Sequence, residues 1–135
     1  MTSLSFINPP GLYDPEPNGY SHVAVVEGAT RWILLAGQGG EAPDGALSPD
    51  FAVQLRQAMD NISIALAAAN ATLRDVVRLT VLVVDHDGAK LEALSRTVRE
   101  RFAGRPAPAC TLIPVPRLAL DGMLVEVEAT AATGR

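Results

Sequence analysis

The residues whose types suit chemistry are concentrated in one stretch, Arg105 to Ala129, which reads RPAPACTLIPVPRLALDGMLVEVEA. It contains the only cysteine, Cys110, and two glutamates, Glu126 and Glu128, in an alternating segment. Side chains two residues apart in a strand point to the same face, so both carboxylates can reach one cleft. A carboxylate withdrawn from water can act as a general acid or base. The alternative is a pair of surface glutamates on an edge or interface strand, and the pattern alone favours that alternative.

The remaining candidate groups stand alone. Cys110 would need an activated thiolate to act as a nucleophile, and a lone cysteine is more often a small buried hydrophobe, so we interpret it as a pocket wall. His22 and His86 are far apart and have no ligand spacing around them, so neither a metal site nor another cofactor is expected. Tyr20 could present its phenol to a ligand, although an amphipathic plug at the start of a strand explains it equally well.

The elements that must position these residues follow the order ββαβαββ. Apolar and β-branched runs predict strands at 20–26, 31–37, 76–84, 109–115 and 123–131. The first two strands are expected to pair as a hairpin around a turn at Glu27–Thr30. The run VVRLTVLVV at 76–84 is nearly continuous in apolar residues, which predicts a central strand covered on both sides.

Two helices are predicted between the strands. Ser48-Pro49-Asp50 indicates a helix start with Ser48 as the cap, and Asn70 suits the left-handed conformation that commonly ends a helix. The second helix is expected to end before Gly104 and Pro106. Apolar residues recur at helical spacing in both segments: Phe51, Leu55, Met59, Ile62, Leu66 and Ala69 in the first, and Leu91, Leu94, Val98 and Phe102 in the second. The predicted fold class is α+β, a ββαβαββ mixed sheet with two helices packed on one face.

Length and composition limit the organisation of the chain. Its 135 residues suffice for one domain, with residues 1–19, which carry four prolines, as an N-terminal arm and residues 20–135 as the domain. Eleven basic and fifteen acidic side chains give 11 − 15 = −4, so no nucleic-acid partner is expected. No apolar run is long enough to cross a bilayer, and no basic leader precedes an apolar core. We therefore expect a cytoplasmic protein with no membrane association.

The last predicted strand has two different faces. Its apolar row, expected to meet the helices, consists of Met123, Val125, Val127 and Ala129. The opposite face combines the two carboxylates with apolar groups of neighbouring strands, such as Leu112 or Ile113. A mixed face of this kind suits burial against another copy of the chain better than full exposure to water. We therefore predict a homo-oligomer.

Five segments resemble, in this order, the RidA/YjgF family of reactive-intermediate deaminases: LLAGQ at 34–38, QLRQAMDNI at 54–62, VVRLTVLVV at 76–84, RPAPAC at 105–110 and VEVEA at 125–129. The resemblance covers about residues 18–131. It implies a chorismate-mutase-like fold and a homotrimer. It also implies three clefts between adjacent subunits, each binding a small-molecule metabolite.

The resemblance also implies a set of site residues. In typical deaminating members the cleft holds a tyrosine, a serine or threonine before Gly-Gln, an arginine two residues before the cysteine, that cysteine, and a glutamate in the last strand. In these members the arginine pairs with the carboxylate of a 2-imino or enamino acid, and the glutamate positions the hydrolytic water. The residues that match here are Tyr20, Gly37, Cys110 and Glu126. Ala36 replaces the hydroxyl residue, and Pro108 stands where the arginine should be.

The proline is the larger departure, because it offers neither a charge nor a backbone N–H. The chain therefore resembles the arginine-lacking branch of the family, for which classical 2-imino acid deamination is not assumed. Arg105, three positions earlier, and Arg117, in the following loop, are candidate substitutes for the carboxylate-binding arginine. The alternative is that both are surface charges.

Two hypotheses of different classes follow. The first is a trimeric hydrolase for an imine, enamine or related reactive metabolite, with Glu126 orienting water. The second is a non-catalytic trimer that binds a metabolite or serves as a scaffold. A third activity, ribonuclease, is attached to the family by name. It is the weakest hypothesis, because the chain is acidic and has neither a basic groove nor paired histidines.

Overall fold

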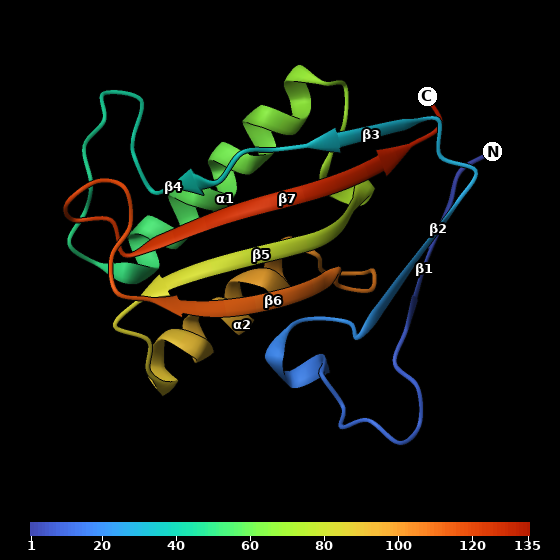
Figure 1. Cartoon of the computed structure of the whole chain (residues 1–135), viewed down its shortest axis with the longest axis horizontal. Coiled ribbons are helices and arrows are strands. Elements are labelled where there is room, and N and C mark those ends of the chain that lie inside the picture. The colour runs from blue at the N-terminus through green and yellow to red at the C-terminus, as the bar shows by residue number, and fades with distance from the viewer.

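The computed structural model describes residues 1–135. Its elements in chain order are β1 (Ser3–Ile7), η1 (Glu16–Asn18), β2 (Val23–Glu27), β3 (Arg31–Leu34), β4 (Gln38–Gly39), α1 (Phe51–Ala68), η2 (Leu73–Asp75), β5 (Val76–Val84), α2 (Gly88–Arg101), β6 (Ala109–Val115) and β7 (Val125–Thr133). Both helices cover one face of the main sheet (Figure 1). The predicted α+β fold and the ββαβαββ order are confirmed, with β1 and β4 as strands that the patterns did not indicate. Neither helix has the length and apolar character needed to span a membrane.

The main sheet is mixed, and its two central strands are β7 and β5. The strand order is β3-β7-β5-β6, and the short β4 pairs with the beginning of β7. β5 and β6 run parallel with Arg78 opposite Ala109 and Val84 opposite Val115, whereas β7 is antiparallel to β3 and β5. β6 therefore forms one outer edge of this sheet.

The predicted hairpin between residues 20–26 and 31–37 is wrong. β2 pairs with β1, with Val23 opposite Ile7, while β3 pairs with the end of β7. Each strand thus has its backbone hydrogen bonds satisfied by a partner distant in sequence, and the turn at Glu27–Thr30 separates two sheets. Figure 1 shows β1 and β2 as a ribbon set at a steep angle to the main sheet. The segment 1–19, expected as an arm, contributes a strand to that ribbon.

α1 supplies the largest part of the core. The predicted periodicity is correct, since Leu55, Met59, Ile62 and Leu66 are all buried in the core, where α1 lies against β7 and β4. Its beginning differs from the prediction, because the capping side chain is Asp50, whose Oδ1 accepts a hydrogen bond from the Val53 N–H at 3.0 Å. The Ser48 hydroxyl instead accepts from the Asp50 N–H at 3.1 Å, two residues too early to cap the helix. Asn70 has a φ of 56°, the left-handed conformation expected at the helix end.

The side chains of β5 alternate between a buried and an open face. Leu79, Val81 and Val83 are fully buried under the helices, whereas Thr80, Leu82 and Val84 on the other face are only half-buried. The prediction of coverage on both sides is therefore wrong for a single chain. We call the helix-free side of the main sheet the open face.

The last two strands contribute unequally to the open face. β7 presents Glu126 and Glu128 there and buries Val125 and Val127, as its alternation predicted. Of the two residues expected to accompany the carboxylates, Leu112 packs against the core and only Ile113 lies on the open face. Ile113 is 43% exposed, which agrees with an uncovered apolar surface.

Candidate functional site

Two of the predicted site residues, Tyr20 and Cys110, line one cavity of about 650 Å³. The cavity lies beside the outer edge of β6, where the chain approaching β2 forms a parallel bridge between Ser21 and Ala109. Tyr13 and Asn18 also line it, so the first nineteen residues help to enclose the space. We call this space the β6-edge cavity.

Cys110 faces the helices and not the open face. It pairs with the fully buried Leu79 across the parallel ladder, and it packs against the core. Burial raises the pKa of the Cys110 thiol to about 11, and the nearby charge of Arg78 lowers it by a smaller amount. The thiol is therefore neutral at physiological pH, which fits the interpretation of Cys110 as a pocket wall.

This pKa predicts slow alkylation of Cys110 by iodoacetamide. At pH 7.5 the rate should be about 100-fold lower than for an unperturbed thiol of pKa 9.0, because only the thiolate reacts. The rate should then increase steeply as the pH approaches 11. Mass spectrometry of the intact chain measures the rate, and the same chain unfolded in urea is the control. Equal rates for the folded and unfolded chains would contradict the assignment.

Tyr20 lies in a small aromatic cluster. Its hydroxyl shares a hydrogen bond with that of Tyr13, and the His22 ring is 5.5 Å from the Tyr20 ring, edge to face. His22 is held in turn by its Nε2, 2.7 Å from the Tyr13 carbonyl oxygen. Burial, with a further contribution from Tyr13, raises the pKa of Tyr20 to about 12. The phenol therefore stays protonated and can donate or accept a hydrogen bond at the cavity wall.

Pro108, which stands where the family has an arginine, anchors a neighbouring segment through its backbone. It is buried, and its carbonyl accepts a hydrogen bond from the Ser21 N–H at 3.1 Å. The Ser21 hydroxyl donates to the Ala107 carbonyl at 2.6 Å, so two bonds fix the chain beside Tyr20. The segment 107–108 thus positions Tyr20 and carries no charge.

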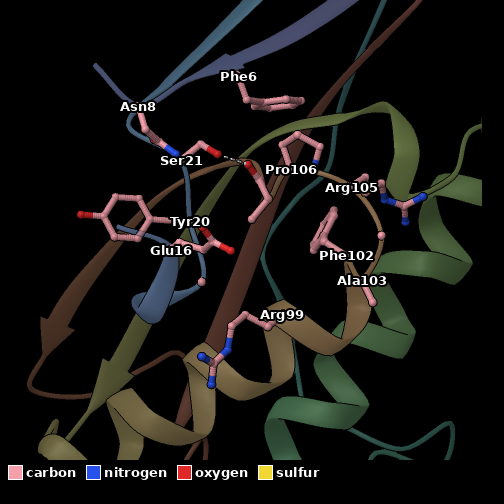
Figure 2. A pocket seen from close by; sticks show the side chains of 13 residues that line it. Phe6, Asn8, Glu16, Tyr20, Ser21, Arg99, Phe102, Ala103, Arg105 and Pro106 are labelled. Carbon is pink, nitrogen blue, oxygen red and sulfur yellow. Dashed lines mark hydrogen bonds between the residues drawn. The ribbon is translucent and has the colours of Figure 1, made fainter. Parts of the chain in front are cut away.

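Neither of the proposed substitutes for that arginine lines the β6-edge cavity. Arg105 lines a second cavity of about 500 Å³, where its guanidinium lies 5.6 Å from the centre of the Phe102 ring. Figure 2 shows Tyr20 and Arg105 on opposite sides of this second cavity, with the guanidinium pointing away from Tyr20. Arg117 is exposed in the loop after β6 and forms an ion pair with Asp121 at 2.5 Å.

A guanidinium reaches the β6-edge cavity from a residue that the sequence patterns did not single out, Arg78 of β5. Arg78 is opposite Ala109 in the parallel ladder, and its Nη2 is 3.4 Å from the Thr111 hydroxyl on β6. The side chain therefore extends across β6 toward the cavity. Arg78 and Cys110 line the same cavity, and the charge of Arg78 partly offsets the effect of burial on the pKa of Cys110.

Glu126 and Gly37 come together on the open face, away from that cavity. β4 pairs Gly39 with Glu126, and a Cβ at position 37 would collide with the Glu126 carboxylate. The absence of a side chain at Gly37 thus allows the backbone to lie against this carboxylate, which would have to move if a Cβ were present. Ala36 next to it is exposed and offers only its carbonyl, which accepts from the Gln38 side chain at 3.3 Å. The Glu126 carboxylate itself has no hydrogen-bond or ion-pair partner in the chain and is only half-buried.

The predicted site is therefore divided into two parts within one chain. Cys110 pairs with Leu79 and Glu126 with Leu82, so their side chains point to opposite faces of the sheet. Two strand spacings and three residues along β5 place their Cα atoms roughly 14 Å apart. No group of three or more His, Cys, Asp or Glu side chains lies together at either part in a way that could hold a metal ion.

Comparison with known proteins agrees with the observed fold. Residues 14–133 match the family model described as Endoribonuclease L-PSP. The RutC family protein YjgH of Escherichia coli K12 is 34% identical over 87 residues, 64% of this chain and 66% of YjgH. The 2-iminobutanoate/2-iminopropanoate deaminase of the same organism is 35% identical over 102 residues, 73% of this chain and 77% of the deaminase.

A solved structure extends the similarity over almost the whole chain. The crystal structure of YyfB from Yersinia pestis, a protein of unknown function of the conserved Rid family, superimposes with a TM-score of 0.91. It is 35% identical and covers 96% of this chain and 98% of its own. The order of segments, the two-layer fold and these matches show that the chain belongs to the RidA/YjgF family, also described as the RutC family.

Proposed function

We propose that the chain forms a homotrimer whose clefts between subunits hydrolyse an imine, an enamine or a related reactive metabolite. The observation that carries this proposal is the division of the site. Tyr20 and Cys110 lie at the edge of β6, whereas Gly37 and Glu126 lie on the open face of β7. A complete cleft therefore needs the β6-edge cavity of one chain to meet the open face of another. The half-buried and exposed apolar residues of the open face support such an association.

In the proposed reaction, water adds to the carbon of the C=N bond and ammonia leaves, so that an imine and water become a carbonyl compound and ammonia. Glu126 orients the water and accepts its proton, because its carboxylate is not engaged by any other group of the chain. The proton then passes to the nitrogen as ammonia departs. Cys110 takes no part as a nucleophile, since burial keeps its thiol protonated.

The similarity to a 2-iminobutanoate/2-iminopropanoate deaminase supports hydrolysis as the reaction class. The name of the family model suggests ribonuclease activity instead, which we do not propose for this chain. Its formal charge is −4, and Arg78 is the only lysine or arginine that lines the β6-edge cavity. A nucleic acid would require a basic surface that follows several phosphates.

The test is a panel of imines generated in place by an amino acid oxidase, with and without a carboxylate. The purified chain is expected to accelerate the release of ammonia and of the carbonyl product above the spontaneous rate. The alternative function is a non-catalytic metabolite-binding or scaffold trimer, which the loss of the hydroxyl at Ala36 and of the arginine at Pro108 favours. A ligand that raises the melting temperature but is recovered unchanged, with no acceleration on the whole panel, would support that alternative.

A further inference from the structure

One wall of the β6-edge cavity comes from residues 9–18, which include η1 and which we call the N-terminal loop. Four of its residues are prolines, and none of its residues belongs to the hydrophobic core cluster. Figure 1 shows it in blue as a wide loop beyond the outer strand β6. The loop can therefore move without disturbing the core.

Both ends of the N-terminal loop are held in place. Before its first residue, the side-chain oxygen of Asn8 accepts a hydrogen bond from the His22 N–H at 2.8 Å. After its last residue, Gly19 has a φ of 81° and lies so close to α2 that a Cβ there would be 2.9 Å from the Ser95 carbonyl oxygen. Movement is therefore limited to the residues between these two points.

Tyr13 alone joins the middle of the N-terminal loop to the rest of the chain. It is the only residue of 9–18 with hydrogen bonds to partners more than four positions away. Its hydroxyl shares a bond with that of Tyr20, and its carbonyl oxygen lies 2.7 Å from the His22 Nε2. The Tyr13 ring also meets the His22 ring at 90°, with the ring centres 5.1 Å apart. Because Tyr13 lines the cavity and is 62% exposed, it stands between the cavity and the solvent.

We propose that Tyr13 is a latch that closes the N-terminal loop over the β6-edge cavity and thereby limits the size of the molecules that enter it. The contacts of this latch are few and lie at the surface, so it can open while the rest of the fold stays intact. The inference rests on the proposed function only for the use of the cavity. In those terms, the latch selects compact metabolites over bulky ones.

The test uses Cys110 as a reporter, because it lines the same cavity. The probes are iodoacetamide and its bulkier N-phenyl derivative. Both react with the thiolate by the same chemistry, so the ratio of their rates does not depend on the pKa of Cys110. In the wild-type chain the N-phenyl reagent should react much more slowly, relative to iodoacetamide, than in the chain unfolded in urea. In Y13A this relative rate should increase roughly 5- to 100-fold, because a hydrogen bond and an aromatic contact of the latch are lost.

Two further variants separate the latch from a general loosening of the loop. Y13F keeps the ring and loses only the hydroxyl, so its relative rate should lie between those of the wild type and Y13A. The matched control is L12A, which shortens an exposed side chain of the same loop that does not line the cavity. L12A should behave as the wild type. Circular dichroism and light scattering confirm the fold and the assembly of each variant.

Three results would overturn the inference: a relative rate in the folded wild type equal to that in the unfolded chain, equal relative rates in Y13A and the wild type, or an equal increase in L12A and Y13A. These measurements need no imine, so they are independent of the proposed reaction. Exclusion of the bulky reagent that depends on Tyr13, without hydrolysis of any imine, would leave the latch standing and refute the reaction. Hydrolysis of small and bulky imines with the same preference in Y13A as in the wild type would do the opposite.

Discussion

Replacing Glu126 by glutamine is expected to abolish imine hydrolysis while leaving the assembly intact. The amide cannot accept a proton from the attacking water, and general-base catalysis by a positioned carboxylate contributes roughly 10²- to 10⁴-fold. Since the Glu126 carboxylate makes no hydrogen bond or ion pair within the chain, its loss removes no stabilising contact of the fold. Ammonia release under saturating imine measures the effect, and light scattering measures the assembly.

Glu128 provides a matched control for this substitution. It lies on the same face of β7 two residues further along, and it is exposed. E128Q removes the same charge but should change the rate less than about twofold, as expected for a solvated surface carboxylate. A large decrease in rate in E128Q with none in E126Q would show that Glu128, and not Glu126, is the catalytic glutamate. Unchanged rates in both variants would show that neither carboxylate takes part in the reaction.

Replacing Gln54 by leucine is expected to decrease the free energy of unfolding strongly. Gln54 is completely buried, and its Nε2 donates to the Ser48 carbonyl at 2.7 Å and to the Gly122 carbonyl at 2.8 Å. Its Oε1 accepts from the Leu124 N–H at 2.9 Å. A leucine would leave these three backbone groups without a partner. At about 1–3 kcal/mol for each buried unsatisfied group, the free energy of unfolding should decrease by about 3 kcal/mol or more.

Urea denaturation at one fixed chain concentration measures this change, because an oligomer's stability depends on concentration. The control is Q57L on the same helix, where a half-buried glutamine forms one side-chain bond, from its Nε2 to the Asn61 Oδ1 at 3.0 Å. A loss in Q54L no greater than in Q57L would show that water or local rearrangement satisfies the three groups. The same network fixes Leu124, two residues before Glu126, so Q54L is also expected to weaken catalysis.

The helices and the long strands could be predicted because local periodicity determines them. The apolar repeat of α1 and the alternation of β7 each specify a buried face within a few residues, and both are found as expected. The pairing of β2 could not be predicted in the same way. A short run such as YSHVAVV indicates a strand, but its partner is chosen by long-range packing, here with β1.

Arg78 shows why part of the site was missed. Within VVRLTVLVV it looks like one polar residue on the solvated side of a strand. Its proximity to Cys110 arises only from the parallel pairing of β5 with β6, across a connection that contains all of α2. Arg105 and Arg117 are closer to Pro108 in sequence, yet neither lines the cavity, whereas the sheet brings the more distant Arg78 to it.

The division of the site between an edge and a face has a consequence for symmetry. A cleft that joins the β6-edge cavity of one subunit to the open face of the next is a head-to-tail contact between two different patches. Because the same contact repeats between successive subunits, an open assembly always has one uncovered β6-edge cavity and one uncovered open face, until the ring closes. A rotation of one third of a turn per subunit closes it at three, whereas a rotation that never closes would produce a growing filament. The geometry that completes each cleft would thereby also set the number of subunits.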